Sequence, residues 1–124
     1  MSIDFNKALG IHAQALQLRA ERTRVLASNL ANESTPGFQA RDMDFAASLR
    51  AAEAEHDGLH LQTVDDEADT QPLYRVPFHP SADGNTVELG VEQAAFAQNA
   101  SDFQMSLTFL NIKLKGLAKA IGGQ

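Results

Sequence analysis

The sequence predicts a mainly α-helical fold in which a long N-terminal helix and a long C-terminal helix pack along a shared seam. Three observations support this prediction: apolar residues recur at alternating spacings of four and three at both ends, all four prolines lie between the ends, and charge is segregated. The chain divides accordingly into an N-terminal helix within 1–35, a short irregular and partly extended segment over 36–90, and a C-terminal helix within 91–124.

Both terminal segments carry an unbroken 4-3 repeat, which is typical of the seam of a coiled coil. The N-terminal seam consists of Phe5, Leu9, His12, Leu16, Arg19, Thr23, Leu26 and Leu30. The C-terminal seam consists of Phe96, Ala100, Phe103, Leu107, Leu110, Leu114, Leu117 and Ile121. Each seam covers about 38 Å of helix at 1.5 Å per residue, and the matched lengths favour pairing. Two amphipathic helices of an ordinary small bundle are the alternative.

Each predicted helix also has a second apolar row outside its seam. These outer rows are Ile11, Leu18 and Val25 in the first helix, and Met105, Phe109 and Ile112 in the second. Helices that are apolar on two faces need neighbours on two sides, and the polar seam residues His12, Arg19 and Thr23 are costly to bury in a closed pair. We therefore expect the outer rows to contact other subunits.

The segment after the first helix begins with a turn. In Thr35-Pro36-Gly37, Pro36 fixes the φ angle of the second position and Gly37 provides the positive φ that a type II turn needs next. A short amphipathic piece is predicted over 45–50, and a weakly structured acidic loop over 51–71.

The rest of the middle segment is predicted to be extended or turned. Residues 73–76 indicate a short extended piece between prolines, and 81–86 indicate a turn around an Asp-Gly pair. Alternation of apolar residues at Val87, Leu89 and Val91 predicts a brief strand or an extended entry to the last helix.

Composition excludes several functional classes. The total charge is −6, and residues 33–95 carry thirteen acids and three arginines, so the chain lacks the basic face of a nucleic-acid binder. The absence of cysteine excludes disulfides, Cys-ligated metals and thiol catalysis. No apolar run approaches the roughly 18 residues of a membrane-spanning helix, and the first residues lack the regions of a cleaved signal peptide.

The acidic segment has two interpretations, a metal site and a solvated loop. His56 and His60 are four residues apart and acids follow them, a spacing that binds metal when it lies on a helix. Gly58 separates the pair and no His-Glu-x-x-His pattern is present. We therefore expect no metal, no cofactor, no catalytic residue and no small-molecule substrate. A metalloenzyme, the remaining alternative, would keep bound metal through dialysis.

The sequence from Val25 to Phe38, VLASNLANESTPGF, resembles the N-terminal signature of the bacterial flagellar rod, hook and hook-filament axial proteins. Further stretches at 39–45, 74–77, 83–87 and 106–111 resemble the proximal rod proteins of that family. Phe38 stands where the family pattern leads us to expect tyrosine. The motif residues are Asn29, Asn32, Thr35, Pro36, Gly37, Phe38, Arg41, Asp42, Phe45, Asp83, Gly84, Asn85 and Thr86.

The resemblance implies a structural subunit of the proximal rod in the flagellar basal body. Such subunits assemble into a tubular shaft that helps to transmit torque and surrounds the protein-export channel. The resemblance also implies an antiparallel helix pair. Aligning the two seams end to end then pairs Phe5 with Ile121, Leu9 with Leu117, Leu16 with Leu110, and Leu30 with Phe96.

Location and partners are implied in the same way. The subunit is expected in the periplasmic rod, exported by the flagellar type III system without a cleaved signal peptide. Expected partners are copies of itself, FlgC-type rod subunits, a FliE-type adaptor, and the MS ring and export gate at the rod base. The alternative is a small soluble helical-hairpin adaptor or export chaperone, which would fold stably on its own.

Overall fold

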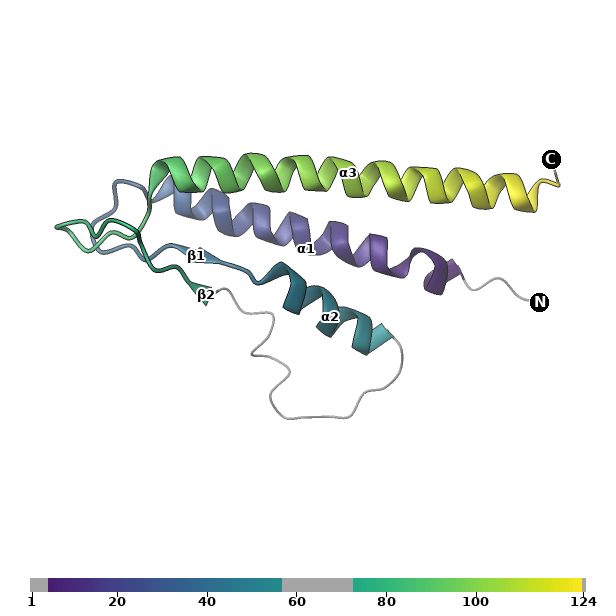
Figure 1. Cartoon of the computed structure of the whole chain (residues 1–124), viewed down its shortest axis with the longest axis horizontal. Helices are drawn as coiled ribbons and strands as arrows, with labels where there is room; N and C mark the ends of the chain where they lie inside the picture. Colours follow the sequence, from purple (N-terminus) through teal and green to yellow (C-terminus); the bar gives the residue numbers. More distant parts are fainter. Residues whose placement is uncertain (1–4, 57–72, 124) are drawn as a thin grey trace.

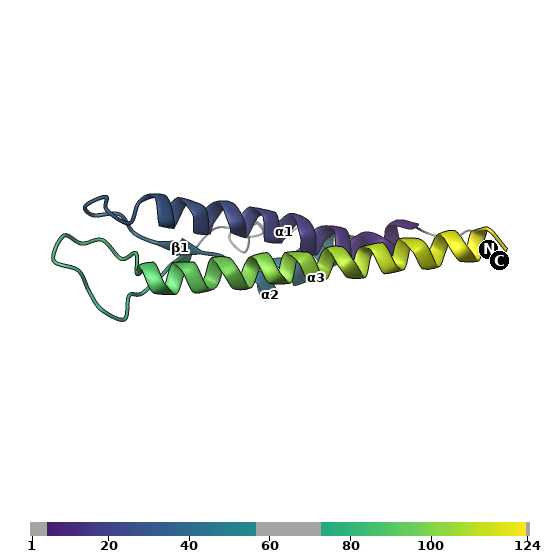
Figure 2. The same ribbon diagram turned by 90° about the horizontal axis from the view of Figure 1, so that it is seen from above.

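The computed structural model describes residues 5–56 and 73–123. The elements follow the order α1 (Phe5–Ala31), β1 (Arg41–Asp42), α2 (Phe45–His56), β2 (Leu73–Tyr74) and α3 (Leu89–Ile121). The middle helix of the three is α1, with α3 along one side and α2 along another (Figure 1). We call the end with the two strands the turn end. The opposite end, where α1 begins and α3 ends, is the open end (Figure 2).

The two long helices run antiparallel, as predicted. Asn29 near the end of α1 contacts Glu92 near the start of α3, and Arg19 contacts Asp102 further along. The end-to-end alignment of the seams instead places Asn29 at the level of Ala97. The predicted register is therefore wrong by about one helical turn, and with it the pairing of Leu30 with Phe96. The polar side chains explain the difference, because burying them without partners costs more than staggering the apolar stripes.

The middle segment has a longer helix than predicted, and of the two predicted alternatives before the last helix it has the extended entry, which ends earlier than the alternation indicated. The helix that begins at Phe45 continues to His56, so α2 includes residues assigned by composition to the acidic loop. At the start of α3 the backbone is extended only up to Glu88, and Leu89 is already helical. The alternation through Val91 therefore belongs to an extended entry followed by helix, and no strand forms there.

The short extended piece is confirmed as β2. It pairs antiparallel with β1, with Arg41 opposite Tyr74 and Asp42 opposite Leu73. The pairing continues for one residue, because the Arg75 amide donates to the Ala40 carbonyl at 2.9 Å. These bonds join the start of the middle segment, at residues 40–42, to its later part at residues 73–75.

The core is small and lies near the turn end. Among the described residues its fully buried apolar side chains are Leu26, Ala40 and Met43, and more polar residues are buried than apolar ones: Asn29, Ser48, Asn85, Glu92 and Asn99. A core of this kind derives its order from hydrogen bonds as much as from apolar burial. In the described part of the chain, no helix is both long enough and apolar enough to cross a membrane.

Candidate functional site

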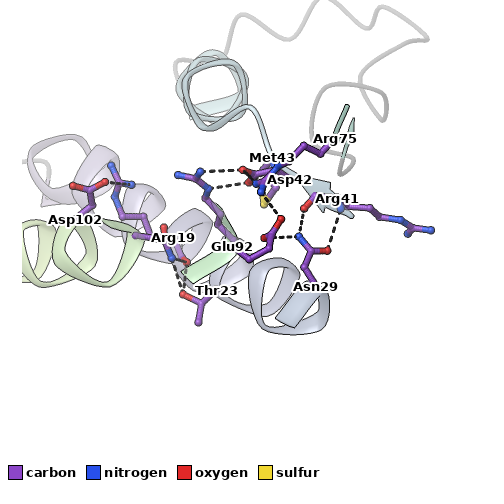
Figure 3. A network of polar contacts seen from close by, with 11 residues as sticks. Arg19, Thr23, Asn29, Arg41, Asp42, Met43, Arg75, Glu92 and Asp102 are labelled. Atoms are coloured by element: carbon purple, nitrogen blue, oxygen red, sulfur yellow. Dashed lines mark hydrogen bonds and ion pairs between the residues drawn. The ribbon is translucent and has the colours of Figure 1, made fainter. Parts of the chain in front are cut away.

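A cluster of five polar side chains connects four elements at the turn end. This polar junction consists of Arg22 and Asn29 on α1, Asp42 on β1, Arg75 after β2, and Glu92 on α3. Figure 3 labels all of these residues except Arg22. Both Asp42 oxygens accept from Arg22, at 2.9 and 3.1 Å, and one also accepts from Arg75 at 2.6 Å. Arg75 donates in turn to Glu92, which is fully buried.

Asn29 completes the junction on the side of α1. Its Nδ2 donates to Glu92 at 3.0 Å and to the Arg41 carbonyl at 2.6 Å, while its Oδ1 accepts from the Arg41 amide at 3.0 Å. The amide side chain thereby pairs with the free edge of β1 as a neighbouring strand would. Asn29 and Glu92 are both buried, away from water. Their polar atoms therefore depend on the other members of the junction for hydrogen bonds.

The junction is electrostatically balanced around Asp42. Burial alone would raise the pKa of Asp42, but hydrogen bonds from Arg22, the Met43 amide and Arg75, together with the charge of Arg22, outweigh it. The pKa of Asp42 in the folded chain therefore lies below its usual value. The hydrogen bond with Asp42 correspondingly raises the pKa of Arg22. Both groups are charged at neutral pH, and the two arginines compensate the partly exposed carboxylate of Asp42 and the buried carboxylate of Glu92.

A second polar group lies within the seam between α1 and α3. The Asn99 side chain donates to the Thr23 hydroxyl at 2.8 Å and to the Arg19 carbonyl at 3.0 Å. The Arg19 guanidinium forms a salt bridge with Asp102 at 3.2 Å and lies 3.8 Å above the ring of Phe45. Arg19 therefore contacts both neighbouring helices. Of the three polar seam residues expected to be costly to bury, Arg19 and Thr23 have partners, although the Nε of Arg19 is buried without one among the described residues.

The two predicted turns pack on each other and end α1. Gly37 has a φ of +74° and Gly84 one of +78°, so both adopt the left-handed conformation. The Phe38 amide bonds to the Thr35 carbonyl at 3.2 Å, which completes the predicted type II turn. The Gly37 amide donates to the Asp83 carbonyl at 3.0 Å, joining one turn to the other.

Asn85 fastens these turns to the end of α1. Its Nδ2 lies 2.8 to 3.0 Å from the carbonyls of Asn32, Glu33 and Thr35, which follow the last turn of the helix. Thr86 contributes a hydroxyl that accepts from the Ala40 amide at 2.7 Å. The side chain of Asn85 thus joins the segment 85–86 to three carbonyls of the turn that follows α1.

The motif residues of the sequence resemblance therefore share a structural role. Asn29 and Asp42 lie in the polar junction, Asn85 and Thr86 join the turns, and Arg41 stacks 5.0 Å from the ring of Tyr74. Sequence reasoning missed Arg22, Arg75, Glu92 and Asn99. A signal existed only for Glu92 and Asn99, whose polar side chains occur at intervals of seven on an otherwise apolar helix face.

The predicted seam is covered unevenly. Leu26 is buried, and the other apolar positions that are half-buried are Leu9, Leu16, Leu30, Phe96, Phe103, Leu107, Leu110 and Leu117. Ala100, Leu114 and Ile121 are exposed, and the side chain of Phe5 lies outside the described residues. On α3, Asn99 rather than Ala100 faces α1. The seam thus opens towards the end of α3.

The outer rows of the two helices differ. On α1, Leu18 and Val25 are half-buried. Leu18 lies one turn from both Gln14, which donates to the Ala52 carbonyl of α2, and Arg22, which binds Asp42. The chain itself therefore covers this face of α1 with α2. On α3, Met105, Phe109 and Ile112 are 51–60% exposed, and Ile11 of α1 is 38% exposed.

No chemistry is evident in the described part of the chain. There, no group of three His, Asp or Glu side chains is placed to hold a metal ion. His60 lies outside the described residues, and of His56 only the backbone is described. The described residues are ordered by a polar end, and among them nothing covers the apolar row of Met105, Phe109 and Ile112 on α3.

Comparison with known proteins identifies the kind of subunit. A family described as "Flagella basal body rod protein" matches residues 9–39, which cover most of α1 and the first turn. A flagellar basal body rod protein FlgB of Cereibacter sphaeroides is 45% identical, with 97% of this chain and 98% of the relative aligned. The proteins of the same name from Aeromonas hydrophila and Salmonella typhimurium are 44% and 42% identical over at least 94% of both chains.

The chain therefore belongs to the flagellar basal body rod proteins, and within them to the FlgB type. It is a structural rod subunit located in the flagellar basal body, where it assembles with other rod components. These relatives do not favour the alternative of a soluble adaptor or export chaperone.

Proposed function

We propose that this chain forms part of the proximal rod, a tubular shaft that helps to transmit torque and surrounds the export channel. The observation that carries the proposal is the exposed row of Met105, Phe109 and Ile112 on α3. Three large apolar side chains on one helix face gain free energy when a neighbouring subunit covers them. The seam residues pack α1 against α3 within the subunit. We expect them also to contact helices of adjacent subunits.

The finer parts of the proposal concern route, location and partners. The subunit is exported by the flagellar type III system without a cleaved signal peptide and resides in the periplasmic part of the basal body. Its neighbours are other copies, FlgC-type subunits and a FliE-type adaptor, with the MS ring and the export gate at the rod base. A core with few buried apolar residues supports export before folding, because little packing energy opposes an unfolded chain.

We further propose that the chain has no catalytic activity. The partly exposed carboxylate of Asp42 and the buried carboxylate of Glu92 are both paired with arginines. Groups engaged in this way hold elements together and are not free to bind a substrate or transfer a proton to it.

The three proposed divisions of the chain, 1–35, 36–90 and 91–124, correspond to two axial helices and a connecting segment.

The experiment that tests the rod proposal uses Phe109→Asp, with Asn111→Asp as the matched control. Both positions are exposed on α3, so neither change disturbs the core of the isolated chain. Phe109→Asp is expected to block entry of the subunit into isolated basal bodies and to abolish motility, while export into the medium continues. Asn111→Asp is expected to retain motility. Equal motility of the two variants would contradict the proposed role of the α3 row.

A further inference from the structure

A second apolar surface lies at the turn end of the molecule. This apolar strip consists of Tyr74, Val76 and Phe78, and its members are 60–85% exposed. The strip backbone is nonetheless held in place. β2 pairs with β1, the Arg75 amide bonds to Ala40, and the Phe78 amide donates to the Glu88 carboxylate at 2.6 Å.

The strip is therefore a preorganised surface. Arg75 points into the polar junction and binds Asp42 and Glu92, while Tyr74 and Val76 on either side of it are exposed. This alternation is that of an extended chain with one side attached to the fold. Because the backbone is already ordered, docking on the strip costs little conformational entropy.

The strip and the α3 row lie too far apart to meet within one chain. The strip is joined to the start of α3 through Phe78 and Glu88, and Met105 follows sixteen residues after Leu89. At 1.5 Å per residue, the row begins about 24 Å along the helix. Contact between the two surfaces therefore requires two copies. A contact between different surfaces of identical subunits generates a ring or an open helical assembly.

Charge favours this pairing over contact of like surfaces. Within residues 73–92 the buried Glu92 is paired with Arg75, which leaves the acids Asp83 and Glu88, and the exposed Arg41 that stacks on Tyr74 brings the net charge around the strip to −1. Residues 103–121 carry three lysines and no acid. Lys113, Lys115 and Lys119 are all exposed beside the α3 row. Two strips facing each other would bring like charges together, whereas strip and row bring opposite charges together.

We propose that the apolar strip of one subunit docks on the row of Met105, Phe109 and Ile112 on α3 of a neighbouring copy. This inference rests on the proposed rod function and names the surface that covers the row. Tyr74 and Phe78 of the first subunit supply large apolar contact areas. The lysines that follow the row on α3 of the second subunit then lie towards the turn end of the first.

The test is a disulfide cross-link between two single-cysteine variants. Phe78→Cys and Ile112→Cys are coexpressed in cells, basal bodies are isolated, and the rods are oxidised. The chain has no cysteine of its own, and a disulfide forms only when the Cα atoms lie within about 7 Å. Phe78→Cys with Gln93→Cys is the control pair, because Gln93 is equally exposed on α3 but lies near the turn end.

We expect the Phe78–Ile112 pair to cross-link several-fold more than the control pair, and the charge reversals Lys113→Glu and Lys115→Glu to lower its yield. Rods that contain both variants but cross-link no more than the control would overturn this contact and leave the rod function intact. Absence of the wild-type subunit from isolated basal bodies would overturn the rod function, and the contact with it. Circular dichroism of each purified variant verifies that the substitutions leave the helices unchanged.

Discussion

The turn end and the open end of the helix pair are stabilised by different means. At the turn end, Asn29, Asp42, Arg75 and Glu92 form a hydrogen-bonded junction, and Asn85 binds the carbonyls that follow α1. At the open end, Leu114 and Ile121 of α3 are exposed although they continue the apolar stripe. The chain thus specifies its geometry at one end and leaves apolar surface for neighbours at the other.

The largest effect is expected at the turn end, from Glu92→Leu. The substitution leaves the Arg75 guanidinium and the Asn29 amide without their buried acceptor. Removing one member of a buried ion pair costs about 3 kcal/mol or more, which should appear as a lower urea midpoint. Gln93→Leu, at the exposed neighbouring position, is the control and should change stability by less than about 0.5 kcal/mol. Similar losses in both variants would contradict the role of the junction.

Acid should weaken the turn end selectively. The pKa of Asp42 is lower in the folded chain than in the unfolded chain, so its contribution to stability is complete at neutral pH. It is lost as the pH falls below about 4, through the lowered pKa. Urea midpoints measured between pH 7 and pH 3 should fall less in Asp42→Asn than in the wild type. Parallel pH profiles for the two proteins would show that Asp42 does not contribute.

Asn99→Leu is expected to have a smaller effect than Glu92→Leu although both positions are buried. The Oδ1 of Asn99 lacks a hydrogen-bond partner within the described residues, and the Thr23 hydroxyl keeps its bond to the Arg19 carbonyl. Replacing a partly satisfied amide by an apolar side chain should change the free energy of unfolding by about 1 kcal/mol or less. A loss of unfolding free energy as large as that of Glu92→Leu would contradict this expectation. It would show that the Asn99 side chain stabilises the fold strongly in addition to setting the register of the two helices.

The smallest effect on the isolated chain is expected from Ile112→Ser at the open end. Ile112 is 60% exposed, so the free energy of unfolding should change by less than about 0.5 kcal/mol. Assembly into basal bodies should nevertheless fall sharply, because the same side chain belongs to the proposed contact. A substantial loss of stability in the monomer would mean that the chain itself buries this face.

The sequence allowed the helices, the turns and the family to be predicted, because each depends on local pattern. Proline placement and the 4-3 repeat locate α1 and α3, and Pro36-Gly37 dictates the type II turn. The register could not be predicted, because apolar stripes fit equally well when displaced by a turn. The contacts of Arg19 with Asp102 and of Asn29 with Glu92 decide it.

The polar junction was also beyond reach from the sequence. Its charged residues lie 17 to 33 positions apart along the chain: Arg22, Asp42, Arg75 and Glu92. At such separations the sequence does not distinguish charged residues that form ion pairs from those that face solvent. The helical extension of α2 to His56 was missed because acidic composition was given more weight than the alanines, which favour helix.

Hydrogen exchange of the isolated chain and of assembled rods tests the central claim most directly. In the isolated chain we expect amide protection to be highest over residues 26–42 and 85–99, and to decline along α3 through 105–121. In rods, protection of 105–121 should rise to the level of the turn end. Uniform and full protection along both helices in the monomer would contradict the account, because the open end would then need no neighbour.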